Sequence, residues 1–535
     1  MNDLKEIFKK NKKAILALAF IILVGIFLRT YKFHDWLRFS HDQARDAWIL
    51  SSALKGKDLP LLGPNAGTTA FQLGPIYYYF SFASEKIFGN YPDKMAYPSV
   101  FFSILSIPLF FFFMREFFER KVALSMTAIM SVSYFLVINS RFSSNPNLIS
   151  FFVLLFLYSI LKMLDGRENR YFIWSVLAGI GMGVAIQLHT TLLTTIPIVA
   201  VITFVYLFKK KVANIGKILL VFAAAFLILN TSQIYHELKS GGSNSNLFFK
   251  GLGSTSGKSD YGKKIFLIAS CQMQANTHII SSFQDDDKCS TIFHKPSGKV
   301  SNKARYYLGM SLMILFSLVG YFLLWNRFYK EKEVKKKNFL GLVILFNLIS
   351  FAIMVPIASI IYVGYFINLF FIPFVLLGLM IEAIQTKYGK MGNKIAIVVV
   401  VFLIICSLYR DGLKAQSYMK GLENNSENST LSEVELISQY VFSSSENSSK
   451  VYFSGQDKLV GRFYYPIEYF ARESRIKIEK ISKESLGSGK INPGTLVFYI
   501  EENNLGKTDP GQMRDDLEIV SKKKFSSQTI LILRR

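Results

Sequence analysis

Apolar stretches of membrane-spanning length recur along the first 410 residues and are separated by short polar or basic segments. A helix needs about 20 mostly apolar residues to cross the hydrocarbon core of a bilayer. The pattern therefore predicts a polytopic α-helical membrane protein. The eleven predicted spans are Ala14–Thr30, Ala96–Phe113, Val122–Asn139, Leu148–Leu164, Phe172–Leu188, Thr191–Phe208, Ile215–Leu229, Tyr306–Trp325, Phe339–Val355, Ile367–Ile384 and Ile395–Leu408.

A polar segment, residues 31–95, separates the first two spans and contains an apolar but short run, Pro75–Gly89, with Glu85 and Lys86. Counting this run as a span would invert the orientation of every later basic loop. We therefore predict an interfacial helix there, with its tyrosines at headgroup level. A second long polar loop is expected over residues 230–305.

The composition changes after Arg410, where Asn, Ser and Glu become frequent. Strand-like runs alternate with helical periodicity in this part of the chain, which predicts a small soluble α/β domain over residues 411–535, following a membrane domain over residues 1–410. The predicted strands are Lys450–Phe453, Ile476–Ile481, Thr495–Ile500 and Thr529–Leu533, and the predicted helices are Leu431–Phe442 and Gln512–Lys523.

Composition and charge agree with a membrane protein: 51% of the 535 residues are hydrophobic and the mean hydropathy is +0.30. The net charge of +25 is concentrated in short runs between spans, as the positive-inside rule predicts for cytoplasmic turns. We therefore expect membrane lipids as partners and no nucleic acid. The N-terminus is expected in the cytoplasm, and the first span is expected to be a signal anchor in the plasma membrane. Both polar loops and the C-terminal domain are then expected outside.

Two of the three cysteines, Cys271 and Cys289, fall in the loop 230–305. In an exported loop, a disulfide and two free thiols both fit this pattern. The chain has no Cys/His spacing typical of a metal site.

The segment Phe39–Gly56 is a candidate catalytic element. Ser40 and Gln43 form a capping-box pattern, which places Asp42 in the first turn of a helix that ends before Gly56. The positive end of the helix dipole favours an ionised carboxylate there, which could act as a base. An apolar stripe formed by Ala44, Ala47, Trp48 and Leu54 suggests that the helix lies on the membrane surface.

In the predicted topology, polar residues gather at the external ends of several spans. Ionisable groups near membrane depth are costly and are functional candidates for that reason. The group comprises His41, Asp42, Arg45, Arg141, Asn145, His189, Tyr362 and Tyr365.

The chain resembles the C-type glycosyltransferase fold, and in particular bacterial members of the protein-mannosyltransferase and lipid A aminoarabinose transferase superfamily, which includes glycosyltransferase family 39. The resemblance rests on HDQARD from His41, LGPIYYYF from Leu73 and RFSSNPN from Arg141, and more loosely on IQLHTTLL from Ile186 and GYFINLFFIP from Gly364. It covers the membrane part of the chain.

The resemblance implies a role for several positions. Asp42 corresponds to the catalytic aspartate of the family, and Arg45 to the arginine of its D-x-x-R pattern. Asn145 stands where relatives often have an acidic residue before Pro, and Gly364 where they often have Arg before Tyr. The missing second carboxylate puts a divalent metal ion, with Asp42 and His189 as its ligands, in doubt.

The implied reaction transfers a sugar from a polyprenyl-phosphate donor to a lipid, glycan or protein acceptor. Asp42 would deprotonate the acceptor hydroxyl, and the phosphate would leave without protonation but with positive charge nearby. Arg141 is the first candidate for that charge, with Arg45 or a metal ion as help. His41, Asn145, His189 and Tyr365 are further candidates for substrate contacts.

Two other classes of function remain open. One is a transporter or lipid flippase, although the spans show no inverted repeat. The other is a non-catalytic assembly protein on the same scaffold.

Overall fold

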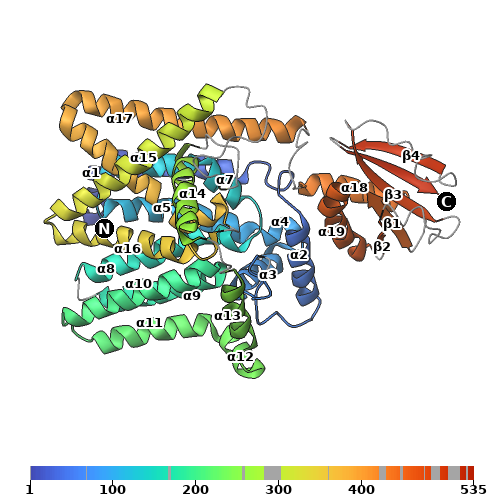
Figure 1. Cartoon of the computed structure of the whole chain (residues 1–535), viewed down its shortest axis with the longest axis horizontal. Helices are drawn as coiled ribbons and strands as arrows, with labels where there is room; N and C mark the ends of the chain where they lie inside the picture. The colour runs from blue at the N-terminus through green and yellow to red at the C-terminus, as the bar shows by residue number, and fades with distance from the viewer. Residues whose placement is uncertain are drawn as a thin grey trace.

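The computed structural model describes the chain apart from residues 1, 68, 167–169, 256–259, 282–288, 290–302, 359–360, 421–428, 446–449, 475, 483–494, 504–517, 526–527 and 535. Long helices run side by side along the long axis of the molecule (Figure 1). Among the described residues, eight helices are long and apolar enough to cross a membrane, and two bent helix pairs raise this number to ten.

The predicted class of fold is confirmed, because each predicted span overlaps one of these helices or pairs; the predicted span Ile215–Leu229 is the first helix of a bent pair that continues to Ser240. The last two predicted spans both overlap α17, although Ile367–Ile384 begins in η4. Helix α17 is interrupted at Gly389 by a non-helical φ of 53° and ψ of −122°. The elements are α1 (Asn2–Thr30), α5 (Tyr97–Arg115), the bent pair α6 (Arg120–Val132) and α7 (Tyr134–Ser140), η1 (Asn145–Leu148), α8 (Ile149–Leu164), α9 (Tyr171–Leu188), α10 (Thr190–Lys209), the bent pair α11 (Ile215–Leu229) and α12 (Thr231–Ser240), α15 (Lys303–Lys330), α16 (Val334–Met354), η4 (Val363–Leu369) and α17 (Ile372–Lys420).

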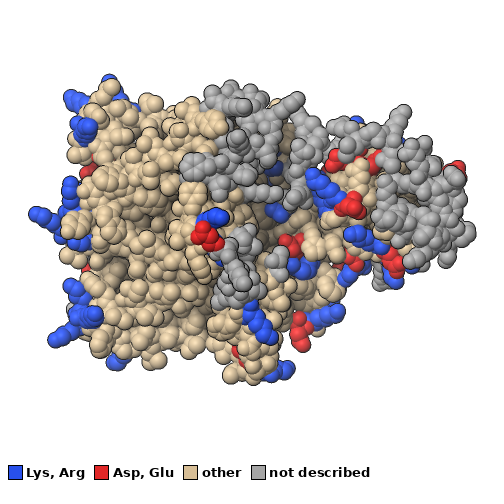
Figure 2. Space-filling model, in the orientation of Figure 1, with Lys and Arg blue, Asp and Glu red and all other residues tan. Residues whose placement is uncertain are grey.

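Lys and Arg side chains gather at one end of these helices, opposite the C-terminal domain (Figure 2). Helices α5, α10 and α15 end there in Arg115, Lys209 and Lys330. The charge asymmetry seen in the sequence is therefore an asymmetry of the folded molecule.

Three helices of the polar segment 31–95 lie at the opposite end: α2 (His41–Leu54), α3 (Ile76–Phe88) and α4 (Pro92–Met95). Helix α3 is not among the apolar helices of spanning length, as predicted. The prediction that its tyrosines lie at headgroup level is wrong for Tyr77 and Tyr78, because both are buried and donate hydrogen bonds to Asp46.

The segment 230–305 contains more structure than the predicted polar loop. It forms α12, α13 (Ser243–Thr255) and α14 (Tyr261–Ser281), and Cys271 is bonded to Cys289. Helix α14 packs against α7, α15 and α17. It buries polar side chains because they find partners on those helices; Gln272, for example, donates a 2.7 Å hydrogen bond to the Tyr321 hydroxyl.

The C-terminal domain contains a five-stranded mixed sheet with strand order β2-β1-β3-β5-β4. Strands β1, β2 and β3 pair in parallel, whereas β5 pairs antiparallel with both β3 and β4. Its elements are α18 (Leu431–Ser443), β1 (Lys450–Gly455), α19 (Asp457–Glu473), β2 (Lys477–Lys480), β3 (Leu496–Glu502), β4 (Glu518–Phe525) and β5 (Gln528–Arg534).

The four predicted strands and the helix at α18 are confirmed, and two interpretations are corrected. The predicted helix Gln512–Lys523 is wrong from residue 518 onward, because β4 is held by its ladder to β5; residues 512–517 lie outside the described part. Helix α19 was not predicted. It packs against α2, so its aromatic residues serve an interface with a distant part of the chain.

The C-terminal domain docks on the segment that precedes and includes α2. Phe39 N donates to Ser429 O at 2.9 Å, and Leu431 N donates to Leu37 O at 2.8 Å. These backbone bonds fix the chain entering α2 against the chain entering α18. Part of the stripe predicted to rest on the membrane contacts protein instead: Ala44 and Ala47 are buried, and the Arg472 guanidinium of α19 lies 4.6 Å from the ring of Trp48, which stays 43% exposed.

Candidate active site

Helix α2 begins as predicted. Ser40 is its N-cap in extended conformation, and its backbone N–H donates to Gln43 Oε1 at 3.3 Å within a capping box. The amide of Gln43 also donates to the Ser143 carbonyl at 3.0 Å. The first turn of α2 is thereby joined to the turn that follows α7.

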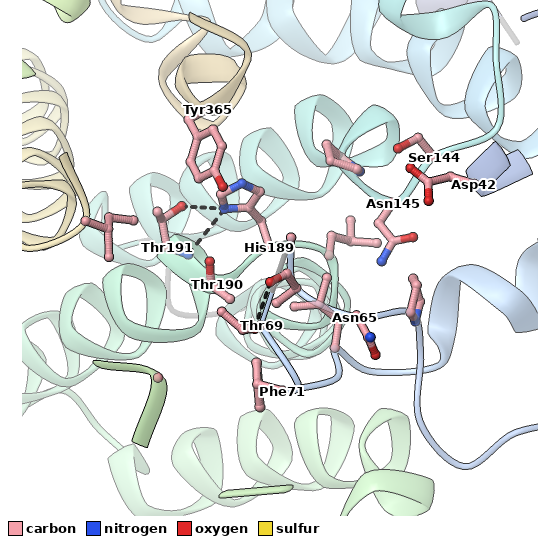
Figure 3. A pocket seen from close by; sticks show the side chains of 18 of the residues that line it. Asp42, Asn65, Thr69, Phe71, Ser144, Asn145, His189, Thr190, Thr191 and Tyr365 are labelled. Carbon is pink, nitrogen blue, oxygen red and sulfur yellow. Dashed lines mark hydrogen bonds between the residues drawn. The ribbon is translucent and has the colours of Figure 1, made fainter. Parts of the chain in front are cut away.

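A cavity of about 340 Å³ lies where this first turn meets the ends of the spans (Figure 3). Asp42 and Asn145 stand on one side of it, and His189 and Tyr365 on the other. The structure thus brings together six of the predicted site residues, which come from four separate parts of the sequence: Asp42, Arg45, Asn145, His189, Tyr362 and Tyr365.

Asp42 lies in the first turn of α2, with a side chain that is 65% exposed. Its Oδ1 accepts a hydrogen bond from Arg45 Nη1 at 3.1 Å. Among the described residues, its Oδ2 makes no hydrogen bond, and this oxygen is therefore free to accept a proton.

Arg45 is shared between two carboxylates. Besides Asp42, it contacts Asp46 through Nε at 2.9 Å and Nη2 at 2.8 Å. Asp46 is buried, also lines the cavity and accepts a 2.9 Å hydrogen bond from the Tyr78 hydroxyl. Burial raises the pKa of Asp46 to about 6, although the adjacent Arg45 opposes this shift.

His189 joins α9 to α10 and caps α10. Its Nδ1 accepts a hydrogen bond from the backbone N–H of Thr191 at 3.3 Å and lies 2.8 Å from the Thr191 hydroxyl. A ring nitrogen that accepts from a backbone N–H carries no proton, so the neutral ring carries its proton on Nε2. Burial lowers the pKa of His189, which favours this neutral form. The Tyr365 ring packs edge-on against it, with the centroids 4.9 Å apart.

Asn145 is 5% exposed and lines the cavity, yet its Nδ2 makes no hydrogen bond within the described residues. A buried donor without a partner costs about 1–3 kcal/mol. Binding of an acceptor atom in the cavity would remove this cost, which makes Asn145 a candidate substrate contact.

Two predicted site residues lie elsewhere, and these predictions are corrected. Arg141 does not line the cavity, because its guanidinium donates to the carbonyls of Leu28 and Tyr31 at 2.8 and 2.7 Å and is thereby held at the end of α1. His41 faces the C-terminal domain, with its ring 4.1 Å from that of Tyr465. Neither residue lines the cavity, although His41 Nδ1 lies 3.6 Å from Asp42 Oδ1.

The residues present do not fit a metal site. No group of three or more His, Cys, Asp and Glu side chains able to hold a metal ion occurs in the part of the chain that the structure describes. Asp42 uses one oxygen for Arg45, and the Nδ1 atom of His189 is occupied by Thr191. We therefore derive no step through a metal ion.

Part of the cavity wall was not identified from the sequence. The turn 63–74 contributes Asn65, Thr69 and Phe71 to the lining. The Gly-Pro pairs at 63–64 and 74–75 are the sequence signal for this turn. In the structure Gly74 lies so close to the rest of the protein that a Cβ there would be 2.3 Å from Gln187. Such a contact admits only glycine.

Comparisons with known proteins support the same fold. Residues 72–235 match the family model described as dolichyl-phosphate-mannose-protein mannosyltransferase. This segment contains α3, Asn145 and His189 but begins after α2, so it does not include Asp42. A comparison of the sequence with curated proteins gives no match.

Several solved structures are similar. ArnT from Cupriavidus metallidurans bound to undecaprenyl phosphate is 11% identical with a TM-score of 0.53, and its apo state is 10% identical with a TM-score of 0.54; each match covers 98% of both chains. The Archaeoglobus fulgidus oligosaccharyltransferase in the apo form is 14% identical with a TM-score of 0.50, over 92% of this chain and 70% of that one. The chain therefore has the C-type glycosyltransferase fold and is similar, over residues 72–235, to the dolichyl-phosphate-mannose-protein mannosyltransferase family.

Proposed function

We propose that this protein is an integral membrane glycosyltransferase that moves a sugar from a polyprenyl-phosphate carrier to an acceptor hydroxyl, with inversion at the anomeric carbon. The observation that carries the proposal is the exposed Asp42 carboxylate, which lines the cavity with Oδ2 available. The undecaprenyl phosphate bound by the structurally similar ArnT supports the choice of donor.

In the proposed reaction, Asp42 Oδ2 takes the proton of the acceptor hydroxyl as its oxygen attacks the anomeric carbon. A new C–O bond forms on one face, and the bond to the phosphate oxygen breaks on the other, with its electron pair leaving on the phosphate. The products are the glycoside, the polyprenyl phosphate and a protonated Asp42. A phosphate leaves readily as an anion, so a general acid is not needed.

Three donors at the cavity are candidates to stabilise the leaving phosphate. Arg45 supplies a positive charge, Asn145 offers an unpaired Nδ2–H, and His189 carries a proton on Nε2. Hydrogen bonds aimed at a developing negative charge lower the barrier most when their donors are already in place. The burial of Asn145 and the capping role of His189 supply that rigidity.

We further propose that the cavity faces the outside of the cytoplasmic membrane. The Lys- and Arg-rich end of the helices (Figure 2) would then lie in the cytoplasm, and the C-terminal domain would lie outside. Labelling of single cysteines introduced at Lys210 and Lys458 with an impermeant maleimide in intact cells tests this orientation. Labelling at residue 458 alone supports it, and labelling at residue 210 alone contradicts it.

The first test is transfer of radiolabel from a panel of short-chain polyprenyl-phosphate sugars to total membrane acceptors. Wild type is compared with Asp42→Asn and with the control Asp58→Asn, which alters an exposed carboxylate outside the cavity lining. We expect transfer by wild type and the control, and its loss in Asp42→Asn.

Equal transfer by all three proteins would show that Asp42 is not the base. If wild type binds the lipid donors without transferring sugar, a non-catalytic role on the same scaffold replaces the proposal. Movement of the lipid between leaflets without transfer would instead support a flippase.

A further inference from the structure

The cavity wall contains a second carboxylate, that of Asp46, which has no role in the proposed reaction. Asp46 lies one helical turn after Asp42 on α2, and its side chain is 4% exposed. Its oxygens accept hydrogen bonds from two helices: from Arg45 on α2, and from Tyr77 and Tyr78 on α3, whose hydroxyls lie 3.3 and 2.9 Å away. A buried carboxylate with this many donors is held in one orientation.

The two bonds from Arg45 to Asp46 determine where the rest of the guanidinium points. A guanidinium is planar and presents its donors in a fixed fork. With Nε and Nη2 both on Asp46 Oδ1, the plane of the guanidinium is fixed, and the observed contact with Asp42 is made by Nη1, 3.1 Å from Oδ1. Arg45 therefore contacts the base through a single nitrogen.

This arrangement protects the reactive oxygen of Asp42. If Arg45 were released from Asp46, its fork could close on both oxygens of Asp42, which is the preferred geometry of an exposed arginine and carboxylate. The oxygen that should take the proton would then be covered, and the positive charge would be displaced from the cavity.

Helix α3 holds the other side of Asp46. The Tyr77 hydroxyl also lies 2.8 Å from Ser143 Oγ, and the Ser143 carbonyl accepts from Gln43 in the first turn of α2. One buried polar network therefore joins α2, α3 and the turn after α7. Of these elements, α2 and the turn after α7 contribute residues to the cavity, and α3 supports them from behind.

We propose that Asp46 is a positioning residue of this enzyme, which clamps Arg45 on the side of Asp42 so that the base keeps one free oxygen. Tyr77 and Tyr78 hold Asp46 in turn. The inference rests on the proposed role of Asp42.

The test compares Asp46→Asn, Asp46→Glu and Tyr78→Phe with wild type, using purified protein in lipid nanodiscs. The first measurement needs no catalysis: phenylglyoxal modification of Arg45 is followed by mass spectrometry, with the exposed Arg472 as reference. We expect Arg45 to react about threefold or more faster in Asp46→Asn, since two of its charge-assisted bonds are weakened. The rate at Arg472 should not change.

The second measurement is the kinetics of transfer. Asp46→Asn should lower kcat by roughly tenfold to a hundredfold with little change in KM, because a small misplacement near the reacting groups costs this much. Asp46→Glu should recover part of the loss, and Tyr78→Phe should show a smaller loss. Wild-type kcat should also fall below about pH 6 as Asp46 is protonated, and this limb should be missing in Asp46→Asn.

The outcomes separate the two proposals. If Arg45 reacts at the wild-type rate in all three variants, or if kcat is unchanged when Arg45 is released, Asp46 is not a positioning residue. If wild type itself transfers no sugar, the proposed function fails, and the labelling of Arg45 still decides whether Asp46 clamps it. If Asp46→Asn does not fold, Tyr78→Phe carries the same two measurements.

Discussion

Glu473 of α19 binds Lys55 at the end of α2, with its two carboxylate oxygens 2.7 and 2.9 Å from the ammonium nitrogen. At the other end of the same helix, Tyr465 of α19 packs edge-on against His41. The helix that carries Asp42 is thus supported along its length by the C-terminal domain. The support that each contact gives to α2 can be measured separately.

Replacement of Phe39 by Ala should weaken the junction between the domains. Phe39 is fully buried, and its ring lies 5.7 and 6.0 Å from the rings of Tyr469 and Phe470. Truncation of a buried Phe to Ala typically costs about 3–5 kcal/mol. Thermal unfolding in detergent should show a large decrease in Tm. Leu436→Ala, which removes an exposed side chain, is the control and should leave Tm almost unchanged.

The junction should also weaken as the pH rises. His34 bridges the domains, with Nδ1 3.3 Å from Asp93 and Nε2 3.2 Å from Glu435. Burial lowers its pKa, but the two carboxylates outweigh this effect and the net pKa is raised. A group whose pKa is raised on folding contributes its full stabilisation below the unfolded pKa and loses it as the pH rises through the folded pKa.

Tm should therefore decrease for wild type as the pH rises past the ordinary pKa of histidine, about 6.5, and through the raised pKa of His34. His34→Gln keeps a polar side chain but cannot be protonated, and should be less stable than wild type at the acidic end only. Tyr91, which donates to Glu435, and Lys94, which pairs with Asp93, are present in both proteins. The same dependence of Tm on pH in both proteins would exclude His34 as its source.

Gly74→Ala should distort the cavity wall. The added Cβ would lie 2.3 Å from Gln187, whose Oε1 accepts a 3.1 Å hydrogen bond from the backbone N–H of Ile76 at the start of α3. Overpacking of this kind costs about 1–3 kcal/mol. We expect a lower Tm and weaker transfer. Gly216→Ala provides the matched control, since a Cβ there meets nothing within 4 Å.

Asn145→Ala should weaken transfer without lowering the thermal stability of the protein. If Asn145 donates to the donor substrate, its loss should lower kcat/KM by about tenfold or more, the value of a hydrogen bond to a charged group. Tm should be unchanged or slightly higher, because the variant no longer buries an unpaired Nδ2. Asn139→Ala, outside the cavity lining, should keep normal kcat/KM. A decrease in Tm without loss of transfer would assign Asn145 a structural role only.

The sequence was most informative where one local signal decided the structure. Apolar length located the spans, and the capping box placed Asp42 in the first turn of α2. Arg141 shows the limit of such reasoning. A charge at the end of a span has the same local pattern whether it faces a ligand or backbone carbonyls, and only the packing of α1 against α7 decides between them.

Asp46 and α19 could not have been assigned from local patterns for a related reason. The role of Asp46 depends on tyrosines from another helix, and the aromatic face of α19 depends on a helix that lies roughly 400 residues earlier in the chain. Tyr77 and Tyr78 were assigned to the membrane surface because aromatic residues are common there. In the structure their hydroxyl groups instead donate hydrogen bonds to the buried carboxylate of Asp46.

The docking of α19 on α2 bears on the order in which the protein is made. The backbone bonds of Leu37 and Phe39 go to Leu431 and Ser429, so α2 emerges from the ribosome long before the residues that hold it. All the predicted spans except the first, Ala14–Thr30, are synthesised in between. The helix with the proposed base acquires its last supports only after the membrane domain has been inserted. A chain interrupted before Ser429 would contain every residue of the cavity but no support for α2 from the C-terminal domain.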